Sequence, residues 1–274
     1  SAVQVDVLRL IFKPAWSDIP QPQEVLAACE RIRRHLGTLV DSHLDNPEAF
    51  DDIASSVIAA RDQESGAPFS REELIDQLGV FFLAGHETTA SALTWAFYIL
   101  ADQSHWLARL REEIAAVVGD APMSFEHTKQ LPLTKAFFKE TLRLYPPITF
   151  MPRVALREAT VGGRRLRKGA LVMIAPWTLQ RHSKWWPDPH AFKPERFLPE
   201  QEAALVQGAY IPFGQGPHTC VGAGFAQTES VLILAELVRR FDWLLEPGQT
   251  VRPAARMTTR PADQVMLHVR SPAV

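Results

Sequence analysis

The sequence YIPFGQGPHTCVGAG, residues 210–224, places Cys220 in a glycine-rich loop that leads straight into a helical pattern. Apolar residues recur at helical spacing from residue 222 to residue 240, and a helix is predicted there. A helix N-terminus offers a partial positive charge and unpaired N–H groups, and both stabilise a thiolate at neutral pH. Glycines such as Gly214 and Gly222 let the backbone come close to the sulfur and to a bulky planar ligand. The loop is therefore predicted to present a thiolate ligand.

Fixed positions in the loop form the pattern F-x-x-G-x-H-x-C-x-G, filled by Phe213, Gly216, His218, Cys220 and Gly222. A lone cysteine is otherwise most often a small buried hydrophobic residue. This pattern resembles the haem-binding signature of the cytochrome P-450 family. Three further motifs lie upstream in the family's order, and the resemblance covers the chain from about residue 70 to its C-terminus.

The resemblance implies a mainly α fold with a minor β-sheet, the cytochrome P-450 fold, incomplete at the N-terminus. Residues 1–274 would form the C-terminal haem-binding portion of a single domain. Haem b is the implied cofactor, with the Cys220 thiolate as axial ligand and as the metal-binding residue. Further haem-binding residues implied in the Cys loop, residues 213–222, are Phe213, Gly214, Gly222 and His218, the last against a haem propionate.

The composition is that of a soluble globular protein with a large core: 274 residues, 46% hydrophobic and 22% charged. A net charge of -2 implies neither nucleic acid nor an anionic membrane as a partner. Cys29 and Cys220 lie far apart and outside any C-x-x-C pair, so the sequence predicts no disulfide framework or zinc site. A reducing, cytoplasmic location fits, and residues 1–274 are not expected to contain a secretory signal. Cys29 falls on an apolar helix face and is predicted to be an inert core thiol.

The N-terminal part of the chain is predicted to be helical. An apolar run followed by a proline-containing break predicts a helix end and a loop in residues 1–20. After Pro22, apolar residues at helical spacing predict a long amphipathic helix that reaches Leu44. A second helix is predicted from about residue 48 to residue 61.

The longest helical pattern runs from about residue 70 to residue 101 and starts with a capping-box signature, Ser70 and Glu73. Residues 78–101 are almost wholly apolar, and ~20 apolar residues suffice to span a membrane. The polar residues 86–89 at the centre argue against a span, because an uncompensated charge there would cost at least ~2.5 kcal/mol. We therefore expect a helix buried through a large protein, and no membrane segment.

The polar centre of this helix, AGHETT at residues 84–89, resembles the family's oxygen-activation motif. Ala84 is small, and it is implied to lie against the haem. An acid beside an alcohol in an apolar wall can relay protons to bound oxygen, which makes Glu87 and Thr88 the candidate catalytic residues. Without the cysteine loop, the same residues would indicate a helix kink stabilised by threonine.

Glu140 and Arg143 lie three residues apart on a helix predicted from about residue 133 to residue 144, and their side chains meet. Such a pair is usually a solvated contact that contributes little. Here it resembles the family's Glu-x-x-Arg motif, which is buried behind the haem and joined by an arginine from a later loop. The sequence FKPERF at residues 192–197 makes Arg196 the candidate third partner. The implied role is structural, since removing one member of a buried charged triad strands the others.

Short β-rich runs follow Pro147, and a Gly-Gly pair at residues 162–163 predicts a small hairpin between two of them. Residues 243–245 and 265–269 are further strand candidates. By resemblance, Arg153 would pair with a haem propionate, while its spacing alone fits a surface charge equally well. The implied substrate-pocket residues are Ile148, Thr149, Phe150 and Thr258, with Met257 beside Thr258 in the same turn.

The resemblance implies a haem-thiolate monooxygenase that inserts one oxygen atom from O2 into an apolar organic substrate. Two electrons would come from a separate electron-donor protein of the ferredoxin or reductase type, because the chain carries no flavin or iron-sulfur motif. Two alternatives are a non-hydroxylating haem-thiolate enzyme (a peroxygenase, isomerase or dehydratase) and an inactive fragment without stable haem. Missing N-terminal helices would expose apolar surface, so self-association is a further expectation.

Overall fold

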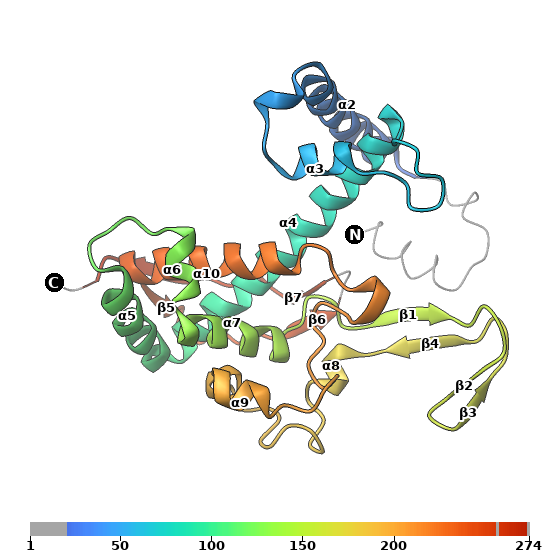
Figure 1. Cartoon of the computed structure of the whole chain (residues 1–274). Coiled ribbons are helices and arrows are strands. Elements are labelled where there is room, and N and C mark those ends of the chain that lie inside the picture. Colours follow the sequence, from blue (N-terminus) through green and yellow to red (C-terminus); the bar gives the residue numbers. More distant parts are fainter. Residues whose placement is uncertain (1–20, 256–257, 273–274) are drawn as a thin grey trace. The chain divides into compact units, whose positions relative to one another are not determined.

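The computed structural model of the protein describes residues 21–255 and 258–272. The chain divides between Glu87 and Thr88, inside its longest helix, into two compact units. The helix end and loop predicted in residues 1–20, and Met257, lie outside the described residues. The described chain is mainly helical with a minor β component (Figure 1), which confirms the predicted fold class.

The N-terminal unit packs helices around a small apolar core. Its elements are α2 (Gln23–Asp45), the 3-10 helix η2 (Pro47–Ala49), α3 (Ile53–Ala59) and the first part of α4 (Arg71–Asp102). The Ser70 N–H donates to Glu73 Oε2 at 2.7 Å, and the Glu73 N–H donates to Ser70 Oγ at 3.4 Å. This reciprocal capping box starts α4 at Arg71. The buried core side chains of the unit are Val40, Ala54, Leu74, Ile75 and Leu78.

Two sequence predictions in this unit are wrong. The helix predicted over residues 48–61 is broken, because Phe50 is extended between η2 and α3. The Asp52 carboxylate accepts the Ser55 N–H at 2.9 Å, and this cap starts a new helix. Cys29 is exposed, since the buried residues of α2 begin only at Gly37, about two turns further along the helix.

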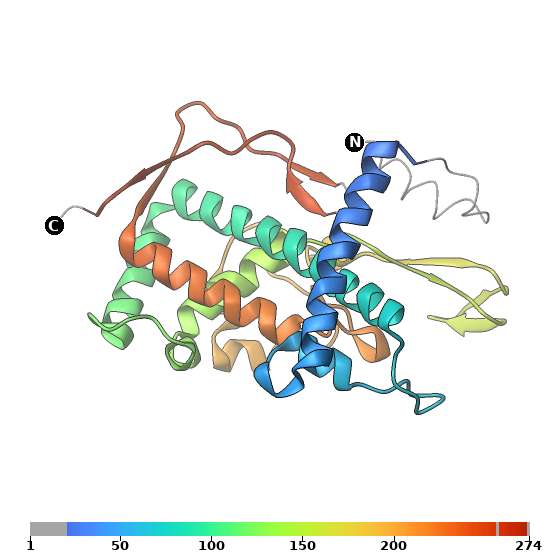
Figure 2. The same ribbon diagram turned by 90° about the horizontal axis from the view of Figure 1, so that it is seen from above.

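The second unit has a helical core in which the last part of α4 lies beside α10 (Figure 2). Apolar side chains of α4, α5, α7 and α10 interlock there in one buried cluster that includes Trp106, Phe137 and Leu234. Pro132 lies in the first turn of α7, where its fixed φ and missing N–H are tolerated. The helices of the unit are α5 (Ser104–Val118), α6 (Phe125–Lys129), α7 (Pro132–Leu144), α8 (Pro176–Leu179), α9 (Pro199–Ala203) and α10 (Ala223–Arg240), with the 3-10 helices η3 (Pro194–Phe197) and η4 (Gly216–His218).

Helix α4 is continuous, but its middle is not buried as predicted. Its buried side chains form two groups, Leu74 to Leu78 in the first unit and Ala92 to Leu100 in the second. Between these groups, Val80, Phe82 and Leu83 are exposed. An apolar composition does not by itself determine which side chains receive packing partners. Among the described residues, no helix has the length and apolar character needed to cross a membrane.

The β-structure of the described residues consists of separate two-stranded antiparallel sheets. Gly162 and Gly163, with φ of 55° and 76°, form the predicted hairpin turn between β2 and β3. Figure 1 shows this hairpin at the far end of the ribbon made by β1 and β4. The strand pairs are β1 (Met151–Val154) with β4 (Leu171–Ile174), β2 (Ala159–Val161) with β3 (Arg164–Leu166), β5 (Asp242–Leu245) with β8 (Leu267–Arg270), and β6 (Pro253–Ala255) with β7 (Thr259–Pro261).

Candidate functional site

The cysteine loop is closed by hydrogen bonds of its own backbone. The Cys220 N–H donates to Phe213 O at 2.8 Å, which joins the two ends of the loop. Gly214 has a φ of 75°, a conformation that favours glycine. A Cβ at Gly214 would also lie 3.4 Å from His218 O and 3.6 Å from Met151 Sδ. The conformation of Gly214 therefore favours glycine, whereas an added Cβ would only come into van der Waals contact with its neighbours.

The sulfur of Cys220 lies next to the N-terminus of α10. Gly222 is the residue that precedes the first turn of this helix. A Cβ built on Gly222 would be 3.9 Å from Cys220 Sγ, so the bare glycine backbone faces the sulfur. The first-turn N–H groups have no acceptor within the helix, and the helix dipole adds partial positive charge. The N-terminal end of α10 therefore lies beside the sulfur.

The surroundings of Cys220 suit a planar apolar ligand. Cys220 is exposed, as are Val221 (82%) and Phe225 (59%). An exposed thiol with apolar side chains beside it, on a glycine-rich backbone, is the donor set that a haem-thiolate site requires. His218 is also exposed, on η4, in the same loop. The residues present therefore fit a haem ligated through sulfur.

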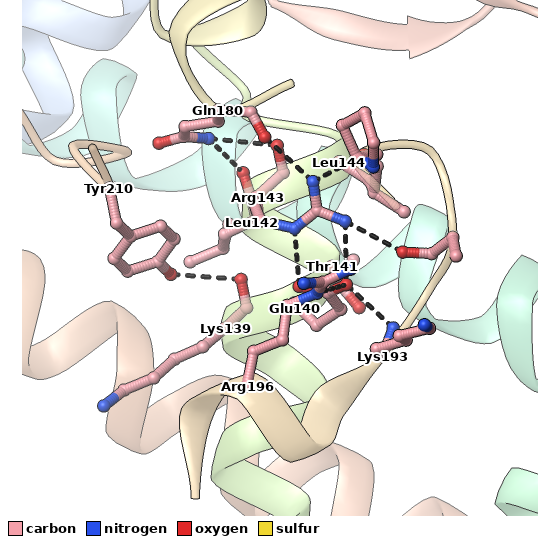
Figure 3. A network of polar contacts seen from close by, with 12 residues as sticks. Lys139, Glu140, Thr141, Leu142, Arg143, Leu144, Gln180, Lys193, Arg196 and Tyr210 are labelled. Carbon is pink, nitrogen blue, oxygen red and sulfur yellow. Dashed lines mark hydrogen bonds and ion pairs between the residues drawn. The ribbon is translucent and has the colours of Figure 1, made fainter. Parts of the chain in front are cut away.

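Glu140 and Arg143 form a fully buried ion pair on α7 (Figure 3). Arg143 Nε donates to Glu140 Oε2 at 2.7 Å, and Nη2 donates to Oε1 at 2.8 Å. The remaining hydrogen bonds of the guanidinium go to backbone carbonyls: Nη1 donates to Gln180 O at 2.8 Å and Pro189 O at 2.7 Å, and Nη2 to Ala191 O at 2.9 Å. All five N–H donors of a guanidinium are thereby used.

Arg196 joins this pair from η3, so the structure brings the three predicted residues together. Its Nε lies 3.5 Å from Glu140 Oε1, and its Nη2 donates to Asp188 O at 3.0 Å. Glu140 Oε1 also accepts the backbone N–H of Lys193 at 2.8 Å. Burial raises the pKa of the Glu140 carboxyl, and the contacts with Arg143, Lys193 and Arg196 oppose that shift. The network holds the segment after α8 in place against α7.

Gln180 belongs to the same network, and the motif analysis did not identify it. Its side chain is fully buried and follows directly after α8. Nε2 donates to Leu142 O and to Arg143 O, both at 3.0 Å. Oε1 accepts the N–H of Ile211 at 3.0 Å, two residues before the Cys loop. The available signal was a polar residue at the end of an otherwise apolar segment, and this signal is weak.

The predicted proton-delivery residues lie on consecutive positions of α4. Ala84 and Glu87 belong to the first unit, and Thr88 is the first residue of the second. Ala84 is exposed, while Glu87 and Thr88 are half-buried. The helix runs without interruption through residues 84–89.

The segment after α7 lies against the turn that carries Thr258. Thr258 is buried, and its neighbour Thr259 donates from its N–H to Pro147 O at 2.8 Å and from Oγ1 to Pro146 O at 2.6 Å. The carbonyl oxygen of Thr259 accepts from Ser91 Oγ at 2.5 Å and from Trp95 Nε1 at 3.0 Å, both on α4. These bonds join the neighbour of Thr258 to Pro147, and the three residues that follow Pro147, namely Ile148, Thr149 and Phe150, are half-buried.

Arg153 lies on β1 and is exposed. Its Nη1 donates to the backbone oxygen of the preceding residue, Pro152, at 2.8 Å. The guanidinium is thus accessible to an anionic group, which is the property that its predicted pairing with a propionate requires.

Comparison with known proteins places this fold and site in one class. The sequence matches the family described as Cytochrome P450 over residues 5–269. The chain therefore belongs to the cytochrome P450 family. It is 37% identical over 228 residues to Cyclooctatin synthase of Streptomyces melanosporofaciens, covering 81% of this chain and 50% of that protein. It is 36% identical over 208 residues to Pentalenene oxygenase of Streptomyces avermitilis, covering 76% and 46%.

The structure is similar to solved members of the family. A retinoic acid-bound cyanobacterial CYP120A1 matches with a TM-score of 0.85 and 30% identity, covering 93% of this chain and 59% of that one. The chain spans about half the length of the curated relatives that it matches. Family membership implies a haem whose iron is bound by a cysteine thiolate, and Cys220 is the cysteine in the matching motif.

Proposed function

We propose that this chain is the haem-bearing part of a cytochrome P450 monooxygenase. The reaction inserts one oxygen atom from O2 into an apolar organic substrate, with two electrons from a separate electron-donor protein of the ferredoxin or reductase type. The observation that carries the proposal is the position of Cys220, in a closed loop with its sulfur against the N-cap glycine of α10. An oxygenase among the relatives supports the same class of reaction.

The chain's own residues have separate tasks in this reaction. Haem b, when bound, supplies oxygen activation and accepts the electrons. Cys220 would hold the haem iron through its thiolate and would supply electron density to it. Glu87 and Thr88 deliver protons from α4. Residues proposed to bind the haem beside Cys220 are Ala84, Arg153, Phe213, Gly214, His218 and Gly222, and those proposed to line the substrate pocket are Ile148, Thr149, Phe150 and Thr258.

The buried triad of Glu140, Arg143 and Arg196 is proposed to have a structural task. It contributes no group to the reaction, because Glu140 and Arg143 are fully buried and their bonds are used within the protein. Its bonds hold the segment from Gln180 to Ala191 against α7. We propose that both compact units belong to one haem-binding portion, residues 1–274.

The reduced carbon-monoxide difference spectrum tests the ligand assignment. Cys220→Ser should abolish the thiolate-type spectrum of the haem-loaded chain, because a hydroxyl is a poor anionic ligand at neutral pH. Cys29→Ser is the matched control, since Cys29 is also an exposed free cysteine but lies on α2. An unchanged spectrum in Cys220→Ser would refute the assignment.

Turnover distinguishes a monooxygenase from other haem-thiolate enzymes. Product should form with NADPH, O2 and an added ferredoxin and ferredoxin reductase, and it should carry ¹⁸O from ¹⁸O2. Product that forms only with added hydrogen peroxide, or without oxygen incorporation, would contradict the monooxygenase proposal.

A further inference from the structure

Gln180 connects two parts of the proposed site that are remote in sequence. Its side chain is completely buried, and each polar atom of the carboxamide is used. The amide nitrogen donates to Leu142 O and Arg143 O at the end of α7 (Figure 3). The amide oxygen accepts the N–H of Ile211. The two carbonyl groups are among those that a helix leaves without partners at its C-terminus.

The network determines the orientation of the carboxamide. Nε2 faces two carbonyl oxygens, which only an N–H donor satisfies, so Oε1 must be the atom that faces the Ile211 N–H. The backbone of Gln180 takes part as well, because its carbonyl oxygen accepts from Arg143 Nη1 at 2.8 Å. Gln180 is thus held by α7 and in turn holds Ile211.

The bond to Ile211 continues into the Cys loop through backbone hydrogen bonds. Ile211 O accepts the N–H of Gly214 at 3.1 Å, and Phe213 O accepts the N–H of Cys220 at 2.8 Å. Ile211 is therefore bonded to Gly214, the residue next to Phe213, whose carbonyl group closes the loop. The path from Arg143 runs through the buried residues Gln180 and Ile211 and the half-buried Phe213 and Gly214, and it ends at the exposed Cys220.

We propose that Gln180 is a positioning residue for Cys220: its carboxamide holds the start of the cysteine loop at a fixed place on α7 and thereby holds the sulfur against the N-terminus of α10. The inference rests on the proposed function for its consequence at the haem. Its structural part, the restraint of the loop through the Ile211 N–H, can be measured without haem.

Two substitutions distinguish the hydrogen bond made by the carboxamide oxygen from the hydrogen bonds made by its nitrogen. Gln180→Met has a similar length and removes every side-chain hydrogen bond. Gln180→Glu keeps an acceptor for the Ile211 N–H and loses the N–H donors to α7. Gln201→Met is the control, because Gln201 is an exposed glutamine on α9.

Native-state hydrogen exchange measures the restraint. In Gln180→Met, we expect the Ile211 amide to exchange about tenfold faster relative to amides of α5, because one buried hydrogen bond is lost. In Gln201→Met, this ratio should stay close to that of the parent protein. In Gln180→Glu, it should rise less than in Gln180→Met, because the acceptor for the Ile211 N–H is kept. An unchanged ratio in Gln180→Met, or an equal change in Gln180→Glu, would overturn the proposal. If Gln180→Met does not fold, Gln180→Asn provides the same measurement, since its shorter side chain cannot reach both α7 and Ile211.

The haem-loaded protein supplies a second readout. We expect the thiolate-type carbon-monoxide spectrum to be lost at lower denaturant concentration in Gln180→Met than in Gln180→Glu. Equal loss in the two variants would contradict the role of the Ile211 bond in placing Cys220. A parent chain without a thiolate-type spectrum would refute the proposed function, while the exchange ratio would still decide the restraint by Gln180.

Discussion

Glu113 on α5 caps the N-terminus of α7 through Thr134, whose N–H and hydroxyl donate to Glu113 Oε2 at 2.9 Å and 2.7 Å. Glu113 Oε1 accepts the N–H of Leu133 at 2.6 Å. The N-cap residue of α7, Leu131, has no side chain that could do this. A carboxylate from another helix therefore satisfies the first-turn donors and complements the helix dipole. Glu113 of α5 therefore holds the first turn of α7, the helix that carries Glu140 and Arg143.

Glu113→Ala should lower the free energy of unfolding by about 1–2 kcal/mol, as the loss of a helix cap does. The measurement is equilibrium unfolding in guanidinium chloride. Glu112→Ala is the matched control, because Glu112 is the exposed neighbour on the same helix. Equal effects of the two substitutions would show that the cap does not contribute.

Glu140→Ala should lower the free energy of unfolding by about 3–5 kcal/mol, because Arg143 would remain as a buried charge without its partner. We expect little folded protein, measured as soluble yield and as the unfolding midpoint. Glu126→Ala is the control, since Glu126 pairs with Lys129 on the surface and such pairs contribute about 0–1 kcal/mol. A soluble Glu140→Ala variant of parental stability would contradict the structural role of the triad.

Thr88→Ala should leave haem binding intact and slow product formation by about 100-fold, the lower range of what a positioned proton donor contributes. Reduced oxygen should then leave as hydrogen peroxide, so the measurement is product and peroxide formed per NADPH. Thr94→Ala serves as control, because Thr94 is an exposed threonine further along α4 that donates to Ala90 O. A parental product yield in Thr88→Ala would count against proton delivery by this residue.

Asp52 should make the N-terminal unit sensitive to acid. The Ser55 N–H and the His43 ring lower the pKa of the Asp52 carboxyl below its ordinary value. Because the folded-state pKa is the lower one, the contribution to stability is complete above the unfolded pKa of about 3.9 and disappears as pH falls through the folded pKa. Asp52→Asn keeps a capping side chain and removes the charge.

The expected result is a lower unfolding midpoint for Asp52→Asn than for the parent at about pH 6, and a smaller difference at about pH 3. Circular dichroism at the two pH values measures both midpoints. If the unfolding midpoints of Asp52→Asn and of the parent differ by the same amount at both pH values, the ionised carboxylate is not the cause of that difference.

Part of the candidate site could be predicted because its residues are close in sequence. Cys220 and the glycines of its loop are a few positions apart, and so are Glu140 and Arg143. Local spacing determines which side chains share a turn or a helix face. The same reasoning failed for Cys29, because a helical apolar face can extend beyond the region where partners cover it.

By itself, the sequence determined the helix periods, the capping box that starts α4 and the loop that carries Cys220, because these depend on neighbouring residues and on backbone preferences. Only the tertiary structure decided which groups satisfy the ends of α7. Glu113 does so across 20 and 21 residues of chain, and Gln180 across 37 and 38. Helix ends accept any donor or acceptor of suitable chemistry that the folded chain brings near, and no spacing in the sequence records which residue that will be.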